Sequence, residues 1–407
     1  MSTWTPDATV TINGVNYTGD TIGTVSINRG RDNVYADPTA SFASVQLIDK
    51  TGVGITIDPA EQLVIDIDDS AGAPVRLFTG SVTDITKTLY DPGLRGLASA
   101  VVTVAAVGPL ARLSRVQVLN AGRPAETDGD RIAAALEEGL GVTWEELPYT
   151  AWEDIPADLT WVTFSGGYDE DLIDPGLFDL IALPAQGGGH NALVVASDAS
   201  RSGQGVLYET ATGLVGWENA DDRGTATNFY DIPSTLTIAS QLATQTSLAD
   251  IVNRVEVTYF GGVATESDAV SIPQFGRWER RIETLLVNEI NAVQYASDYI
   301  RRHAFPAVNL EQVTVRLDGQ PDALADELLA LDLNSPVNLQ DVPATFGEPF
   351  LPGFVEGLTW RIDAHRAELQ LLVSDANLST GDLRWSQIGS TVTWADLSTT
   401  LTWQDWR

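Results

Sequence analysis

The fold is decided by an alternating stretch near the N-terminus, Ala8-Thr-Val-Thr-Ile-Asn-Gly14. Val10 and Ile12 fall on one face of an extended strand, because successive side chains of a β-strand point to opposite sides. The Asn13-Gly14 pair that follows is typical of the two-residue turn of a β-hairpin. This stretch therefore predicts an antiparallel sheet that begins close to the N-terminus.

The same period of two continues along the first quarter of the chain. It recurs in residues 24–28, 43–48, 63–67, 77–85 and 99–107. Short strands at this spacing, separated by turns, are typical of β-sandwiches and β-barrels. We therefore predict an N-terminal, tube-like β-barrel or sandwich domain over residues 1–108.

The next part of the chain is strongly acidic. Residues 121–190 contain 15 acidic residues and two arginines, a net charge of −13. Asp128 is expected to cap a short helix that passes through Arg131–Glu138 and stops at Gly139. The composition predicts a central acidic domain that contains tryptophans, over residues 109–234.

Strand and helix patterns alternate in the rest of the chain. The expected strands are 206–210 and 214–217, which form a hairpin, and 254–259, 313–317, 357–363 and 368–374; the expected helices are 248–253, 288–303 and 321–331. The longest helix has apolar residues at helical spacing and is followed by Pro306. These patterns favour a second β-rich domain with helices over residues 235–375, and a β-rich α+β fold class for the whole chain.

Tryptophan recurs every nine residues in two parts of the chain. The repeat joins Trp152 to Trp161, Trp385 to Trp394 and Trp394 to Trp403, and Trp144 begins a shortened copy. It predicts a stack of short strands and turns, whose last copies form a C-terminal extension over residues 376–407. The rings either pack on one another as a small core or stay exposed and stack on sugar faces of a cell-wall polymer.

The composition excludes several kinds of chemistry. The chain has no cysteine, which rules out a thiol nucleophile, a disulfide framework and a cysteine-ligated metal. His190, His303 and His365 have no metal-ligand spacing, and no nucleophile elbow or phosphate loop occurs. At a helix end, His303 is expected to interact with the helix dipole. We therefore expect no enzyme activity, no cofactor and no metal.

Carboxylate pairs are the one catalytic arrangement that stays open. A glycosidase needs two carboxyl groups about 5–10 Å apart, and 56 acidic residues allow many such pairs. The densest clusters are Tyr168–Asp171 and Asp66–Ser70, and the second lacks the glycine and the terminal glutamate of an EF-hand calcium loop. A solvated surface is the simpler interpretation of both clusters.

The charge balance limits the partners. The formal net charge is −33, with 56 acidic against 23 basic residues, so the chain repels phosphate groups at long range. The sequence has no apolar run of about 18 residues and no basic leader followed by an apolar run, so we expect neither membrane insertion nor a signal peptide.

The most basic stretch relative to its surroundings contains Arg277, Trp278, Arg280 and Arg281. Arginine and tryptophan together are favoured at protein interfaces, although ordinary surface pairing also explains the stretch. These four residues and the six repeat tryptophans are the candidate interaction residues.

The order of these elements resembles the tail hub proteins, or minor tail proteins, of long-tailed bacteriophages, particularly phages of actinobacteria. The passages that carry the likeness are Val25–Arg31, Leu77–Gly80, Asp130–Gly139, Gly205–Tyr208, Gly213–Trp217, Arg223, Ile251–Tyr259, Ser271–Gly276 and the helix before Pro306. Together they cover most of the chain. The tryptophan-rich stretches depart from the family pattern.

The resemblance implies a structural virion protein at the phage tail tip, made in the host cytoplasm. Hubs of this kind form a ring, commonly a homotrimer, from two related barrel domains per chain. The resemblance therefore implies that residues 1–108 and 235–375 form two tube-like β-barrel domains. The ring joins the tail tube protein or distal tail ring to a tail fibre or receptor-binding protein. It also gives a channel for the tape-measure protein and for DNA, which acidic walls would keep from adhering.

Two alternatives stay open beside the hub. The protein is then either a glycan-binding tail-tip module that recognises the host cell wall through its tryptophan repeats, or an acidic glycan hydrolase.

Overall fold

The computed structural model describes eleven stretches of the chain. They are residues 3–18, 22–32, 36–49, 54–91, 99–141, 168–220, 229–237, 243–245, 248–306, 309–343 and 351–375. The tryptophan repeats, with Trp144, Trp152, Trp161, Trp385, Trp394 and Trp403, lie outside these stretches, as does the C-terminal extension 376–407.

The N-terminal strands form as the sequence predicts. They are β1 (Ala8–Ile12), β2 (Val15–Tyr17), β3 (Ile22–Gly30), β4 (Phe42–Asp49), β5 (Gln62–Asp68), β6 (Pro74–Asp91) and β7 (Ser99–Val107). Asn13 and Gly14 have positive φ angles of 48° and 77°, which lets Ile12 pair with Val15 across a two-residue turn. The alternation is visible in the burial, since Val10 and Ile12 are both in the core.

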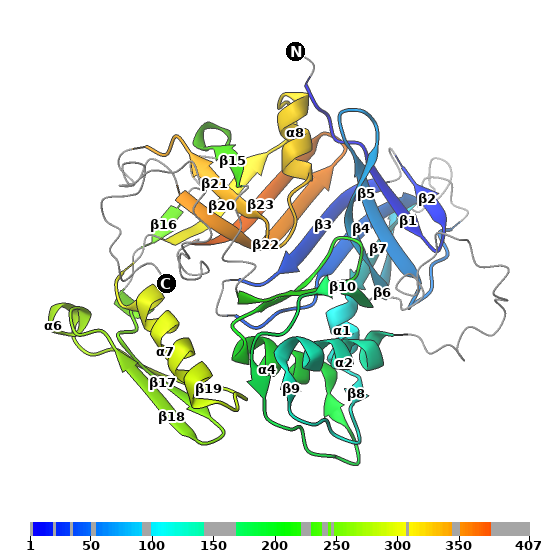
Figure 1. Ribbon diagram of the computed structural model, residues 1–407. Helices are drawn as coiled ribbons and strands as arrows, with labels where there is room; N and C mark the ends of the chain where they lie inside the picture. The colour runs from blue at the N-terminus through cyan, green and yellow to red at the C-terminus, as the bar shows by residue number, and fades with distance from the viewer. Residues whose placement is uncertain are drawn as a thin grey trace.

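The C-terminal strands belong to the same sheet. They are β15 (Tyr230–Pro233), β16 (Ala243–Gln245), β20 (Asn309–Arg316), β21 (Pro336–Gln340), β22 (Leu351–Asp363) and β23 (Arg366–Asp375). Short helical elements accompany them, namely η4 (Ser234–Leu236) and α8 (Asp322–Leu329). Buried side chains of α8, among them Leu328, join the core of this sheet, and α8 lies beside it near the N-terminus (Figure 1).

One strand pair connects the two halves of the chain. Thr24–Gly30 of β3 pairs antiparallel with Gly357–Asp363 of β22, so that the strands merge into one 13-stranded sheet. This sheet corrects the expectation of two separate, closed barrels: among the described strands its path runs from β16 to β2, and no pairing joins those two ends. The β-rich class is confirmed; the expected closure is wrong because one edge of the N-terminal set, β3, pairs with β22 of the C-terminal set, while β2 and β16 remain at opposite ends of the path.

A second lobe follows β7 and contains the helices α1, α2 and α4. Its elements are α1 (Pro109–Leu113), β8 (Gln117–Val118), β9 (Glu126–Thr127), α2 (Asp128–Leu140), β10 (Tyr168–Ile173), β11 (Asp179–Leu180), β12 (His190–Asn191), α4 (Ala192–Ser202), β13 (Val206–Glu209) and β14 (Val215–Glu218). The hairpin of β13 and β14 is as predicted. The cap of α2 is Thr127, whose side chain accepts from the Asp130 N–H, and not Asp128; the helix also continues past Gly139.

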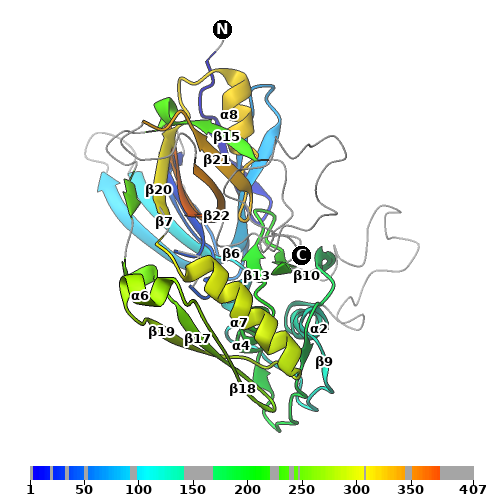
Figure 2. The same ribbon diagram turned by 60° about the vertical axis from the view of Figure 1, so that its left-hand side comes forward.

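A third group of elements is inserted between β16 and β20. It comprises η6 (Leu248–Asp250), β17 (Arg254–Tyr259), β18 (Gly262–Ser267), α6 (Ser271–Phe275), β19 (Glu279–Glu283) and α7 (Glu289–His303). Figure 2 shows α7 lying across the three strands, below the large sheet. None of the helices in the described stretches is long and apolar enough to cross a membrane.

The buried side chains form two cores. One core belongs to the large sheet and includes Trp360 and Leu369. The other joins the helical lobe to the inserted group, because Leu136 of α2, Ala196 of α4 and Tyr295 of α7 belong to one cluster. The four-segment division of the chain stays a prediction, and the buried residues of 251–304 group with the central lobe and not with the later strands of segment 235–375.

A substitution at Gly30 tests the pairing of β3 with β22 that connects the two halves of the sheet. The φ of Gly30 is +89°, and an added Cβ would lie 2.2 Å from the carbonyl oxygen of Glu356. We expect Gly30→Ala to lower the free energy of unfolding in urea by more than about 3 kcal/mol, because backbone strain and a backbone clash combine. Gly14 is the control: its φ is +77° but nothing lies within 4 Å, so Gly14→Ala should cost only the strain, about 1–2 kcal/mol. Equal losses in the two variants would contradict the packing argument.

Candidate interaction site

The Arg–Trp stretch predicted as an interaction site lies on and just before β19. Arg277 donates to the carboxylate of Glu279 at 2.5 Å, and the Trp278 indole N–H donates to the carbonyl of Phe275 at 3.0 Å. Arg281 is exposed on the face of β19 opposite to Arg280. Of the four, Arg280 lines the cavity described below, and their joint role as an interaction site stays a prediction.

An aromatic ladder on α7 holds Arg280 in place. Tyr295, Tyr299 and His303 are four residues apart and stack along the helix, with the rings of Tyr299 and His303 4.0 Å apart and nearly parallel. The Arg280 Nη1 donates to the Tyr299 hydroxyl at 2.8 Å, and its guanidinium lies 5.8 Å from the centre of the Tyr299 ring. These contacts restrict the rotamers of an otherwise flexible side chain.

His303 is a neutral member of this ladder. Burial, followed by the nearby positive charges of Arg302 and Arg280, lowers the pKa of His303 to about 4. Its Nδ1 lies 2.7 Å from the carbonyl oxygen of Tyr299. A neutral imidazole does not supply the positive charge that the expected interaction with the helix dipole requires, so that expectation is wrong at neutral pH.

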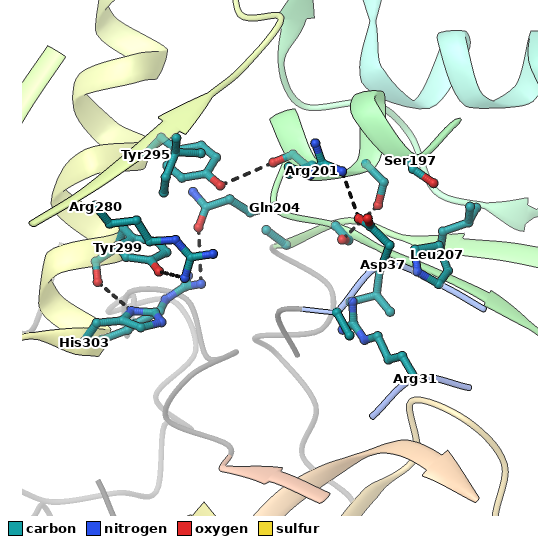
Figure 3. A pocket seen from close by; sticks show the side chains of 18 residues that line it. Arg31, Asp37, Ser197, Arg201, Gln204, Leu207, Arg280, Tyr295, Tyr299 and His303 are labelled. Carbon is teal, nitrogen blue, oxygen red and sulfur yellow. Dashed lines mark hydrogen bonds and ion pairs between the residues drawn. The ribbon is translucent and has the colours of Figure 1, made fainter. Parts of the chain in front are cut away.

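The cavity beside the ladder has a volume of about 190 Å³. Figure 3 shows the side chains that line it: they come from the segment after β3, from α4 and the turn that follows it, and from β19 and α7. Four of them are arginines, namely Arg31, Arg201, Arg280 and Arg302, and Asp37 is the one acidic lining residue among those described. We refer to this space as the arginine cavity.

The arginines of the cavity are held by specific contacts. Arg31 forms an ion pair with the buried carboxylate of Glu356 at 2.7 Å, and Arg201 forms one with Asp37 at 2.8 Å. Arg302 Nη1 donates to Gln204 Oε1 at 3.4 Å. Of this set, the candidate interaction residues include Arg280 alone; Arg31 and Arg201 lie far from β19 in the chain and share no motif with it.

A buried carboxylate connects the large sheet to the helical lobe. Glu209, at the end of β13, is only 2% exposed, and its two carboxylate oxygens accept from the N–H groups of Ser41 at 2.7 Å and Leu110 at 2.6 Å. Burial raises the pKa of Glu209, while these N–H groups and the charge of Arg29 oppose the rise. Arg29 in turn donates to the Glu209 carbonyl at 2.7 Å and pairs with Asp332 at 2.6 Å.

Two other residues considered for catalysis or metal binding, His190 and Asp66, contact neighbouring groups of the protein. His190 Nε2 lies 2.8 Å from the carbonyl of Pro184, and Asp66 pairs with Arg76 at 2.5 Å. The described stretches contain no group of three or more His, Asp or Glu side chains placed to hold a metal ion. The absence of enzyme activity stays a prediction.

Comparison with known proteins places the fold. The chain matches no family model and no curated protein sequence. Its structure is similar to that of the 43 kDa tail protein of prophage MuSo2 from Shewanella oneidensis, with 12% identity and a TM-score of 0.55 over 92% of this chain and 98% of that one. It is also similar to the tail protein from Neisseria meningitidis MC58, with 10% identity and a TM-score of 0.57 over 93% and 100%. The three chains share a fold along almost their entire length.

The buried Glu209 carboxylate should be needed for stability. Glu209→Gln places an amide N–H₂ against one of two backbone donors, so that donor loses its acceptor inside the protein. We expect the free energy of unfolding in urea to fall by about 2–3 kcal/mol. Glu327→Gln, on the exposed face of α8, is the matched control and should change it by less than about 0.5 kcal/mol. A Glu209 variant as stable as this control would contradict the role of the junction.

Asp128 should make stability depend on pH. It is fully buried at the start of α2; burial raises its pKa from 3.8 to about 6, although the N–H groups of Leu177 and Phe178 donate to it. The folded state then binds more protons than the unfolded state, so this group stabilises the fold at low pH, and the contribution is lost as the pH rises from 3.8 through 6. The full effect is about 3 kcal/mol.

Asp128→Asn removes this titration. In urea titrations, the stability of the variant relative to the wild type should increase as the pH rises from about 4 to about 8. The reason is that the wild type must bury a charged carboxylate at the higher pH, whereas the variant does not. Asp130→Asn, on the exposed side of the same helical turn, is the control. Parallel pH profiles for wild type and Asp128→Asn would refute the assignment.

Proposed function

We propose that this protein is a structural subunit of a phage tail and acts in the virion. The observation that carries the proposal is the fold shared with two phage or bacterial tail proteins over more than 90% of each chain. The family resemblance of the sequence, made from separate passages, points to the same class. Neither argument uses the other, since the compared chains are only 10–12% identical to this one.

The finer proposal is a tail hub, in which copies of the chain form a ring, commonly a homotrimer. The open edges of the 13-stranded sheet support it, because β2 and β16 end the path of pairings among the described strands. An unpaired strand edge exposes backbone N–H and C=O groups that readily pair with another chain. The sheet of a single chain is open at these edges. Pairing between the edge strands of neighbouring copies would join the copies into a closed ring.

Such a ring would connect the tail tube or distal tail ring to a tail fibre or receptor-binding protein. Its channel would pass the tape-measure protein and then DNA. The net charge of −33 supports a wall to which DNA does not adhere, provided that acidic side chains line the channel.

The free edge of β2 has one residue suited to a direct test. Ile12 and Val15 close a two-residue hairpin and form its first hydrogen-bonded pair. The next pair, Thr11 and Asn16, is therefore a non-hydrogen-bonded pair, and the N–H of Asn16 faces away from β1. Asn16→Pro removes an N–H that is not used in the pairing of β2 with β1, and proline is tolerated at such edge positions.

The matched control lies on another edge strand. Tyr259 and Gly262 close a two-residue hairpin between β17 and β18, so Val263 occupies the position equivalent to Asn16. Both residues are exposed. Mass photometry should show an oligomer for the wild type and for Val263→Pro, and a shift toward monomer for Asn16→Pro. A wild type that stays monomeric and does not join tail fractions would contradict the hub; an Asn16→Pro oligomer as stable as the control would contradict edge pairing through β2.

A further inference from the structure

The arginine cavity has the opposite charge pattern to the rest of the chain. The protein has 56 acidic and 23 basic residues, yet the described lining residues of this cavity include four arginines and one aspartate. Two of the arginines already face carboxylates, since Arg31 pairs with Glu356 and Arg201 pairs with Asp37 and Asp198. Basic side chains concentrated around a hollow create a local positive potential, and walls of low polarity increase its strength. The cavity is thus a place where an anion is attracted by a protein that repels anions elsewhere.

The arginines approach the cavity from different walls. Arg280 lies on the side of β19 and α7, whereas Arg31 and Arg201 lie on the side of the sheet and α4 (Figure 3). A guanidinium group offers several N–H donors in one plane, which matches the oxygens of a carboxylate or phosphate group. An oxyanion between the walls would therefore receive donors from more than one side.

Arg280 is already in position for such contacts. Its hydrogen bond to the Tyr299 hydroxyl and its place over the Tyr299 ring fix the guanidinium before any ligand arrives. A side chain that is ordered in advance loses less entropy on binding. The nearby Gln204 adds an amide that contacts Arg302 across the same space.

The other titratable groups of the wall do not add negative charge at neutral pH. Burial raises the pKa of the Tyr295 and Tyr299 phenols, so both keep their protons. His303 is neutral because its pKa is lowered to about 4. Apart from Asp37, the described lining residues of the cavity are cationic, neutral polar, aromatic or aliphatic.

Asp37 shows that a carboxylate fits at the edge of this space. Its side chain accepts from Arg201 at 2.8 Å, although it is 72% exposed. An ion pair so exposed to solvent contributes little to stability, about 0–1 kcal/mol. A ligand with more than one negative charge can therefore compete with Asp37 for Arg201.

The volume limits the ligand. About 190 Å³ corresponds to about six water molecules at roughly 30 Å³ each. This space accepts a phosphate ion or a small polycarboxylate, and it is too small for a length of nucleic acid or polysaccharide.

We propose that the arginine cavity binds one small polyvalent oxyanion. Arg280 contacts the ion from β19, Arg302 contacts it from α7, and Arg201 contacts it from α4. Bound there, the ion connects the inserted group of elements to the helical lobe. The proposal is independent of the role in a phage tail.

Titration calorimetry of the full chain with inorganic phosphate and, separately, with citrate tests the site at physiological ionic strength and neutral pH. One saturable site per chain is expected, and the tighter of the two probes identifies the oxyanion as a phosphate or a carboxylate. Arg280→Gln should weaken binding by at least about tenfold, because it removes a charge-assisted donor. Arg281→Gln is the matched control: it changes the adjacent residue of β19, on the opposite face, and should bind as the wild type does.

A second variant and a second measurement distinguish a loss of binding from a misfolded variant. Arg201→Gln acts from the other wall and should weaken binding in the same way, while the thermal midpoint of the wild type should rise with phosphate or citrate and that of the two cavity variants should not. The proposal is overturned if neither probe gives saturable heat or a midpoint shift. It is equally overturned if Arg281→Gln weakens binding as much as Arg280→Gln does.

Discussion

The structure depends on the pairing of β3 with β22. These strands are more than 300 residues apart in the chain, yet Gly30 lies against Glu356 and Gly357 so closely that no side chain fits. The pair turns two sets of strands into one sheet with one core. The helical lobe and the inserted group lie in the chain between these two strands, so the pairing closes a long loop that contains both. Closing so long a loop costs entropy, which the buried area of a continuous sheet must offset.

Buried ion pairs accompany that junction. Glu356 interrupts the register of β22 against β23, and its carboxylate accepts from Arg31 and from the Ser374 hydroxyl. Arg29, at the end of β3, pairs with Asp332 and donates to the carbonyl of Glu209, and Arg31 directly follows that strand. In a chain with so few cations, three parts of the fold are connected by these two arginines. Burying such an ion pair costs free energy, but burying one of its charges without the partner costs more. The pairs therefore favour the correct packing of these parts of the fold over incorrect arrangements.

The charge of the chain has two different consequences. Among the described residues, most acidic side chains stay in contact with water, where their charge opposes compaction only weakly because of screening. Arginines are instead used at places where parts of the structure meet, in the junction around Glu209 and Glu356 and in the arginine cavity. Of the four residues in the predicted Arg–Trp site, only Arg280 belongs to such a place. The local composition indicated the right strand but not which face of it is used, since alternate residues of a strand point to opposite sides.

The sequence by itself determined the local structure: the Asn13-Gly14 hairpin, the strands with alternating side chains, α2, α7 and the β13–β14 hairpin all follow from turn chemistry and periodicity within a few residues. The tertiary structure alone decided that the strands form one open sheet and that residues 251–304 share a core with α2 and α4. It also decided that Arg31, Arg201 and Arg280 meet around one cavity. The physical reason is that periodicity records only which face of an element is buried, whereas the partner of that face is selected by packing between residues far apart in the chain.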